Sequence, residues 1–339
     1  MTDNVDASES EDENDQIDIL RTIPSEKSIT ARAGDRVSSF DVISKQIRMM
    51  ELFYPKDKES PFELPVVYED DHIAIVNKPA GVPVFSHRKG GHGSMTVRSA
   101  LPYVLTKPRR GTLKGLRRAH PVHRIDLPTS GILICAKTKP ALVTLNEMFV
   151  RREIKKDYTA VVSGAPSEYQ TDDLAKVRNG DEGEWHTIDN DLDGKKAITH
   201  WKVRKIACPK KLNGNRIMLV DVKLETGRHH QIRRHFSSAL NCPLLGDKRY
   251  DGGSEKAKSF RDLGLFLCAS RVSFKHPYYN TDIGKKEWIS GDCPGKDSPF
   301  IREDKAPKNS DIDFEVMIDA KIELPKKYED IFSEVVGKL

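Results

Sequence analysis

The feature that most limits the fold of this chain is a series of short apolar runs, rich in β-branched residues and separated by residues that turn the chain. These runs occupy residues 66–79, 132–137, 157–164, 197–207, 215–227 and 265–274. Such runs predict β-strands. Apolar residues at helical spacing lie between them, at residues 95–105, 140–154 and 229–240. Because the helices do not alternate strictly with the strands, the pattern predicts an α+β fold with a largely antiparallel, mixed central sheet and flanking helices.

Composition divides the chain into four segments, at residues 1–24, 25–63, 64–300 and 301–339. The first is acidic and poor in apolar residues, which predicts a disordered tail. The second predicts a helical extension and a linker, and the third contains all the predicted strands and is the predicted folded domain. Within this domain the polar, Asp/Gly-rich residues 166–195 predict a loop. The last segment predicts a C-terminal extension with a terminal helix that begins near Pro325.

Several classes of protein are excluded by the composition. No run approaches the roughly 18 apolar residues of a membrane helix, and the N-terminus is acidic and lacks the apolar region of a signal peptide. We therefore expect no membrane partner and a cytoplasmic or nuclear location. The five cysteines contain no CxxC pair, and His229, His230 and His235 have no cysteine or carboxylate at a ligand spacing. The sequence thus predicts neither disulfides nor a metal site.

The charge of the chain is concentrated in a basic run without acids. No Asp or Glu occurs from His72 to Ile125, where eleven lysines and arginines fall. The first 20 residues hold eight acids and no bases, so the remaining 56 bases and 43 acids give the rest of the chain a net charge of +13. This predicts a polyanionic partner. Glycine and proline interrupt "KPRRGTLKGLRR", which predicts a loop that follows an RNA backbone through five basic side chains: Arg109, Arg110, Lys114, Arg117 and Arg118.

One carboxylate ends this run, in "HRIDLPTSG", where Asp126 follows Arg124 by two residues. A second acid-free stretch, "TGRHHQIRRHF", contains Arg228, Arg233 and Arg234. We expect one of these arginines to hold Asp126 through a bidentate contact and to favour its ionised form. An oriented, ionised aspartate can act as a nucleophile or as a base.

Four stretches together resemble one family. "HRIDLPTSGILICAKT" resembles the signature of the RluA-type pseudouridine synthases, "IAIVNKPAGVPV" resembles their strand and "NKPAG" turn, and "KKDYTAVVSG" resembles their tyrosine motif. "LETGRHHQIRRHFSSALNCPLLGDKRY" resembles their "TGRxHQIRxH" and "GHPIxGDxxY" block. The order and spacing of the motifs agree with the family over residues 65–280, which implies the pseudouridine synthase fold with a catalytic cleft.

The resemblance implies that the chain converts uridine in RNA, either tRNA or rRNA, to pseudouridine as a monomer and with no cofactor or metal. It makes Asp126 the catalytic carboxylate, which either attacks the ribose C1′ or removes a C2′ proton to give a glycal. Arg233 matches the arginine that pairs with this aspartate. Tyr158 matches the tyrosine that stacks on the target base and handles its C5 proton. The alternative is a catalytically inactive RNA-binding relative.

Five further residues are implied to bind the substrate. Arg124 matches the arginine beside the vacated base stack, where it holds the nucleotide out, and Ile232 matches an apolar wall for the base. Arg228, His230 and Gln231 belong to the same motif block. Their contacts must offset the few kcal/mol, roughly, that removing a base from its stack costs.

Overall fold

A computed structural model describes residues 59–86, 95–109, 111–112, 114–164, 166, 177, 183–208, 216–252, 261–291, 293–305 and 314–333. Three predictions lie wholly or mostly outside these residues: the acidic tail 1–24, the extension 25–63 except its last five residues, and Arg110. The domain boundaries therefore stay predictions.

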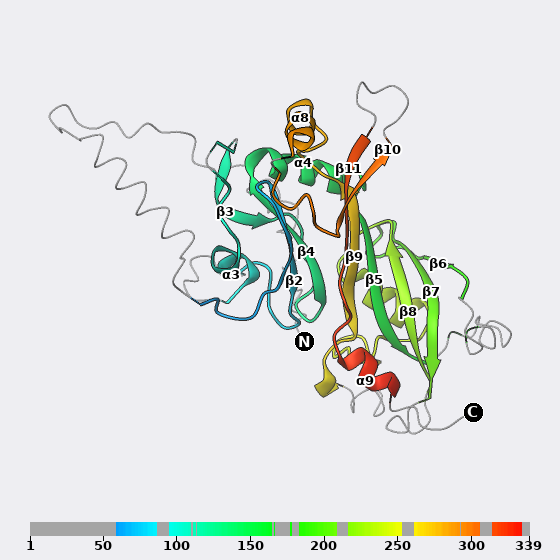
Figure 1. Ribbon diagram of the computed structural model, residues 1–339. Helices are drawn as coiled ribbons and strands as arrows, with labels where there is room; N and C mark the ends of the chain where they lie inside the picture. The colour runs from blue at the N-terminus through cyan, green and yellow to red at the C-terminus, as the bar shows by residue number, and fades with distance from the viewer. Residues whose placement is uncertain are drawn as a thin grey trace, which may run out of the picture. The chain divides into compact units, whose positions relative to one another are not determined.

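Eleven strands of the described residues form one sheet, whose main path runs β1-β2-β4-β9-β5-β8-β7-β6 (Figure 1). Their bounds are β1 Val66–Glu69, β2 Ile73–Lys78, β3 Gly115–Pro121, β4 Ser130–Thr138, β5 Lys155–Ser163, β6 His186–Asp189, β7 Ile198–Ala207, β8 Ile217–Leu224, β9 Leu267–Lys275, β10 Ile301–Lys305 and β11 Phe314–Lys321. All the described pairings are antiparallel except β4 with β9, which are parallel. The predicted mixed, largely antiparallel sheet of an α+β fold is confirmed.

The helices are short and lie between the strands in the chain, except α9, which follows the last strand. They are α3 Val97–Val104, α4 Lys139–Val150, α6 Gln231–Arg234, the π-helix η2 His235–Ala239, the 3₁₀ helix η3 Arg261–Leu263, α8 Asp282–Ser290 and α9 Lys327–Ser333. The single helix predicted over 229–240 is thus a short α-helix that continues as a π-helix, a conformation often found at functional sites.

Strand β4 is buried on both faces, as the unbroken apolar run predicted, because a helix covers each face. Ile132 and Ile134 pack in a cluster with α4, whereas Leu133 and Cys135 pack in a different cluster with α3. Successive side chains of a strand point to opposite faces, so these two clusters lie on opposite sides of the sheet. All nine residues of β4 are buried as a result.

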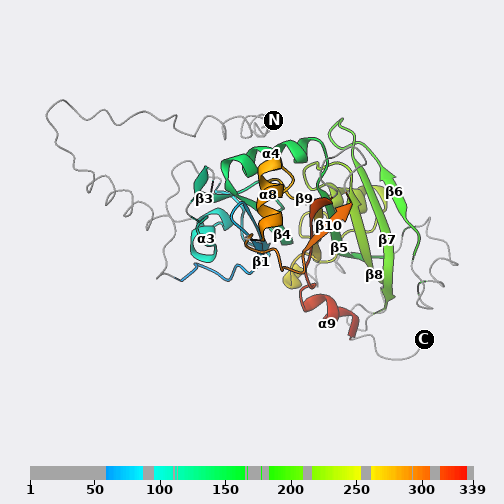
Figure 2. The same cartoon turned by 45° about the horizontal axis from the view of Figure 1, so that its top comes forward.

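The β5-β8-β7 part of the sheet is covered differently on its two faces. One face carries a core of Tyr158, Trp201, Val222 and Phe236, to which α6 and η2 contribute. On the other face α9 packs at one end of the strands (Figures 1 and 2). Among the described residues, an apolar core covers the first face along its length, whereas α9 covers only part of the second.

Two sequence predictions need correction. Arg117 and Arg118 do not lie in a loop, because they belong to β3, which pairs with β4. The predicted loop 166–195 contains β6, which pairs with β7. In addition, the sheet continues beyond residue 300, since β11 pairs with β9.

Candidate active site

The loop that carries Asp126 joins β3 to β4 and is closed by a tight turn. The Thr129 N–H donates to the Asp126 carbonyl at 3.0 Å. The neighbouring Ile125 is buried in the core beneath β5, which fixes the loop against the sheet. The Asp126 side chain keeps 27% of its surface exposed, so the carboxylate is accessible from outside.

A buried lysine ties this loop to the "NKPAG" turn. Lys78 is fully buried and donates to the carbonyls of Pro79 at 3.0 Å, Val82 at 2.8 Å and Leu127 at 3.2 Å. The Gly81 N–H donates to the same Leu127 carbonyl at 2.8 Å. Burial lowers the pKa of Lys78 to about 8, although the charge of Asp126 acts in the opposite direction. The two motifs therefore form one unit, which the sequence did not indicate.

Gly131 brings the start of β4 against β9. A Cβ at this position would lie 2.3 Å from the Ala269 carbonyl oxygen, and its φ is +115°. Only glycine tolerates both conditions. The close approach allows the parallel pairing of Ser130 with Cys268 and of Gly131 with Ala269. The loop of Asp126 is thereby placed beside Tyr158, which pairs with Ala269 from the other side.

Arg233 lies next to Asp126 but is held by another acid. Its Nη1 is 3.5 Å from Asp126 Oδ2. The bidentate contact runs instead to Asp247, with Nε to Oδ2 at 2.7 Å and Nη2 to Oδ1 at 2.8 Å. Asp247 also accepts the N–H groups of Arg249 and Tyr250. The expected bidentate pair of an arginine with Asp126 is thus wrong, because buried Asp247 occupies that side of the guanidinium.

The pKa of Asp126 is raised above its ordinary value. Burial is the largest cause, and the charges of Arg233, His229 and Arg124 oppose it. We expected the basic surroundings to dominate, and here the loss of hydration outweighs them. Burial also raises the pKa of Tyr158 well above its ordinary range, with the charge of Asp126 as the next cause. The phenol is therefore protonated at neutral pH.

Apolar side chains form one wall beside Asp126. Tyr158 on β5 and Ile232 on α6 are both buried and belong to the same core cluster as Ile125. Leu267 and Ala269 of β9 complete this cluster near the loop. The structure thus brings together three segments that are far apart in the chain and that the motifs had singled out.

His230 approaches Asp126 without pairing with it as an ion. Its Nε2 lies 3.8 Å from Asp126 Oδ2, and its Nδ1 hydrogen-bonds to the Tyr250 hydroxyl at 2.9 Å. Burial, together with the nearby Arg233, lowers the pKa of His230 to about 3. The imidazole is therefore neutral at physiological pH. His229 stacks on it, with ring centroids 3.8 Å apart.

Gln231 and Arg228 have structural partners. The Gln231 amide oxygen accepts from Thr226 at 2.8 Å and from the Arg228 N–H at 3.0 Å. Its amide nitrogen donates to the Ile198 carbonyl and the Thr199 hydroxyl, both at 2.9 Å. This side chain therefore positions the loop before α6, and its predicted contact with substrate stays a prediction. Arg228 Nε donates to the Lys196 carbonyl at 3.1 Å.

The predicted backbone-binding residues are exposed and do not touch Asp126 in the part of the chain that the structure describes. Lys114, Arg117 and Arg118 are exposed near or on β3, and Arg124 is exposed two residues before Asp126. Arg109 is anchored to Asp71, with Nε to Oδ2 at 2.7 Å. The acid that the local sequence lacks is supplied from the β1–β2 turn.

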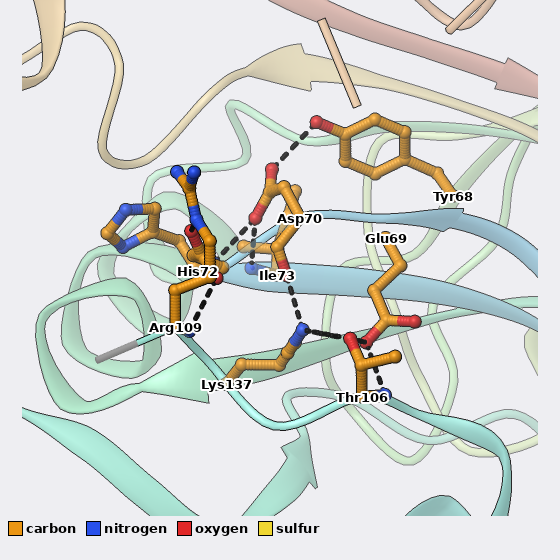
Figure 3. A network of polar contacts seen from close by, with 9 residues as sticks. Tyr68, Glu69, Asp70, His72, Ile73, Thr106, Arg109 and Lys137 are labelled. Atoms are coloured by element: carbon orange, nitrogen blue, oxygen red, sulfur yellow. Dashed lines mark hydrogen bonds and ion pairs between the residues drawn. The ribbon is translucent and has the colours of Figure 1, made fainter. Parts of the chain in front are cut away.

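Figure 3 shows the network around that turn. Lys137 donates to Glu69 at 2.7 Å and also to the Asp70 carbonyl. Asp70 is buried and accepts from Tyr68 at 2.7 Å and pairs with His276 at 2.7 Å. The network joins the β1–β2 turn to the end of β4 and to the segment that leads into β3. Sequence reasoning missed it, because its members are spread over more than two hundred residues.

The described residues contain no group of three or more His, Cys, Asp or Glu side chains that could hold a metal ion. Within the same ranges, no helix has the length and apolar character needed to cross a membrane.

Comparison with known proteins points to a single family. The family model for RNA pseudouridylate synthase matches residues 72–238. The ribosomal large subunit pseudouridine synthase D of Zymomonas mobilis is 35% identical over 247 residues, which cover 71% of this chain and 74% of the relative. The tRNA pseudouridine synthase C of Vibrio parahaemolyticus is 30% identical over 239 residues, covering 68% and 92% of the two chains. Among solved structures, human RNA pseudouridylate synthase domain containing 4 is similar, with a TM-score of 0.49 and 19% identity over 86% of this chain and 97% of that one.

Proposed function

The chain belongs to the RNA pseudouridylate synthase family, and on this premise we propose that Asp126 is the carboxylate with which it isomerises uridine to pseudouridine in tRNA or rRNA. The observation that carries the proposal is the placement of Asp126. It is an accessible carboxylate 3.5 Å from a buried arginine and beside an apolar wall that includes Tyr158 and Ile232. A protein that only binds RNA has no use for an acid in this position, because the acid repels phosphate.

The reaction is an isomerisation, so it needs no oxidant or co-reactant. The bond from uracil N1 to ribose C1′ breaks, the base turns within the site, and C5 bonds to C1′. The C5 proton leaves and N1 gains a proton. Asp126 in its ionised form either attacks C1′ or removes a C2′ proton, and both routes remain part of the proposal.

The neighbours of Asp126 have separate roles in this proposal. Arg233 gives the carboxylate a positively charged neighbour and is itself kept in place by Asp247. Tyr158 packs against the target base, and its protonated phenol is close to where the C5 proton leaves. Ile232 provides the apolar wall, and exposed Arg124 holds the displaced nucleotide.

The choice of RNA rests on the relatives, which are named for ribosomal and transfer RNA. Lys114, Arg117 and Arg118 are proposed to contact the phosphate backbone, with Arg228 and His230 closer to the target nucleotide. Action as a monomer, and in the cytoplasm or nucleus, completes the proposal and rests on the sequence alone.

The proposal predicts that Asp126→Asn abolishes pseudouridine formation, by at least about 10³-fold. The amide is nearly isosteric but neither attacks nor removes a proton, so RNA affinity should stay within a few-fold of the original. Product is measured by mapping pseudouridine in RNA from cells that lack the protein, after incubation with each purified variant. Asp193→Asn, an exposed acid paired with Arg234, is the matched control and should be fully active. Undiminished product with Asp126→Asn would refute the assignment, whereas no product from the original protein on any RNA would favour the inactive relative.

A further inference from the structure

The face of the sheet opposite Tyr158 carries charged and polar side chains beyond the part that α9 covers, and we call it the outer face. Along β5, Tyr158 points to the core, so Asp157 and Thr159 point to the outer face. One row of charged side chains crosses β8, β5, β9 and β11. Along this row, Lys223 lies opposite Asp157, Asp157 lies opposite Arg271, and Arg271 lies opposite Lys321. These side chains line a groove with a volume of about 1420 Å³, which α9 closes at one end. More than half of its lining residues are charged, whereas small-molecule pockets are predominantly apolar, so the groove suits a charged macromolecule.

An exposed tryptophan lines this groove. Trp185 immediately precedes the edge strand β6 and is 43% exposed, whereas Trp201 and Trp288 are buried. Lys223 Nζ lies 4.4 Å from the centroid of its ring, and Lys202 Nζ lies 5.4 Å from it. An exposed indole flanked by two ammonium groups has no role in the core. It does provide an aromatic surface with cations within reach of whatever stacks on it.

The three aspartates of the outer face, Asp157, Asp221 and Asp319, are engaged by arginines. Arg271 makes a bidentate pair with Asp319 at 2.6 Å and lies 3.6 Å from Asp157. Arg204 pairs with Asp221 at 3.4 Å. In contrast, Lys223 makes no ion pair with any acid in the described ranges. Lys223 therefore provides a positive charge for a ligand near Trp185.

From this arrangement we propose that the outer face is a second RNA-binding surface, on which a base of a single strand stacks on Trp185 while Lys223 contacts a flanking phosphate. Single-stranded RNA is typically bound by aromatic side chains on an open sheet face, with basic residues that follow the backbone. A base that stacks on the indole displaces one ammonium group from the face of the ring. The displaced ammonium group then lies next to a phosphate of the bound strand. The proposal rests on the proposed function, since it assigns the surface to an RNA enzyme.

The position of this surface determines which RNA segment it binds. The target uridine is bound on the opposite face of β5, at Asp126, so the outer face cannot touch that nucleotide. It binds single-stranded RNA that extends beyond the modified stem or loop. Its contribution is affinity for long substrates, and the chemical step on a minimal stem-loop is independent of it.

The test is titration of the full-length protein with oligouridine of about ten nucleotides, within the range that a single-strand site spans, while tryptophan fluorescence is recorded. We expect quenching of the original protein and loss of that quenching in Trp185→Phe, because the two buried tryptophans are shielded.

Trp185→Ala should weaken binding about tenfold, as expected for loss of one stacked base. Lys223→Glu should weaken binding at least as much, and Lys286→Glu, an exposed lysine on α8, should not. An oligomer without bases should bind more weakly and quench little.

Three results would overturn the inference. The first is quenching that persists in Trp185→Phe, and the second is unchanged affinity in both Trp185→Ala and Lys223→Glu. The third is equal quenching by polyglutamate, which would assign the surface to an acidic protein. Pseudouridine formation in the same preparations separates this inference from the proposed function. Product without a Trp185 signal refutes the second surface alone. A Trp185 signal without product refutes the proposed function and supports the surface.

Discussion

Arg233 divides its guanidinium between two carboxylates that have different surroundings. Asp247 is buried and accepts both hydrogen bonds of the bidentate contact, while Asp126 is accessible and lies 3.5 Å from the remaining nitrogen. A tight bidentate pair would hold the Asp126 oxygens and reduce their reactivity. Because Asp247 takes that contact, Asp126 keeps a positive neighbour and remains available to a ribose.

The raised pKa of Asp126 predicts the acid limb of the pH–rate profile. The reaction needs the ionised carboxylate, and burial favours the protonated form, so the rate should fall as the pH decreases through an apparent pKa above 3.8. The measurement is single-turnover pseudouridine formation against pH, with RNA affinity determined at each pH as the control. A rate that stays constant down to the ordinary carboxyl range would contradict this prediction.

The residues of the site were only partly predictable. A lone acid at the end of a basic run identified Asp126, and the resemblance pointed to Tyr158 and Arg233. The partner of Arg233 could not be predicted, although Asp247 lies only 14 residues further along the same motif block. The choice between two acids depends on how α6 and the following turn fold together. Lys78 was interpreted as part of a turn, because burial of a lysine cannot be recognised from its neighbours in the chain.

At the scale of elements, the start of β4 depends on one glycine. Gly131→Ala should reduce the free energy of unfolding by about 2–5 kcal/mol, because the Cβ would meet the Ala269 backbone at a positive φ. Urea unfolding measures this loss. Gly291→Ala is the matched control, since its φ is +85° but nothing lies within 4 Å of its Cβ. The free energy of unfolding of this control should fall by only about 1–2 kcal/mol. Equal losses in the two variants would show that the close approach of β4 to β9 is not important.

Strands with long apolar runs were predictable, and short polar strands were not. The runs that became β4, β5, β7, β8 and β9 carry a hydrophobic pattern on at least one face, and each is eight to ten residues long. In contrast, β6 has four residues, "HTID", and β10 is "IREDK". Their pairing comes from edge hydrogen bonds and tertiary contacts, which leave little trace in the pattern of side chains. Likewise β3 was interpreted as a loop because its arginines obscure the alternation.

For the whole molecule, the basic charge predicts an affinity for RNA that depends on salt. Log K should fall with log salt at a slope of about 0.7 for each phosphate contact with a single strand. Arg117→Ala, an exposed residue of β3, should lower the magnitude of this slope by about 0.7. Filter binding at several salt concentrations gives the slope, and Lys286→Ala is the control that should leave it unchanged. An affinity independent of salt would remove the basic run from the interface.

The position of β9 in the sheet determines how late in synthesis the protein can finish folding. This strand lies between β4 and β5, although both are synthesised more than a hundred residues before it. Until Leu267–Lys275 leaves the ribosome, the strand that pairs with both β4 and β5 is missing, and the edges of these two strands are open to incorrect partners. A nascent chain that stops before residue 267 contains Asp126, Tyr158 and Arg233 but lacks the strand that joins their supports. We therefore expect unfinished copies to be unable to modify RNA.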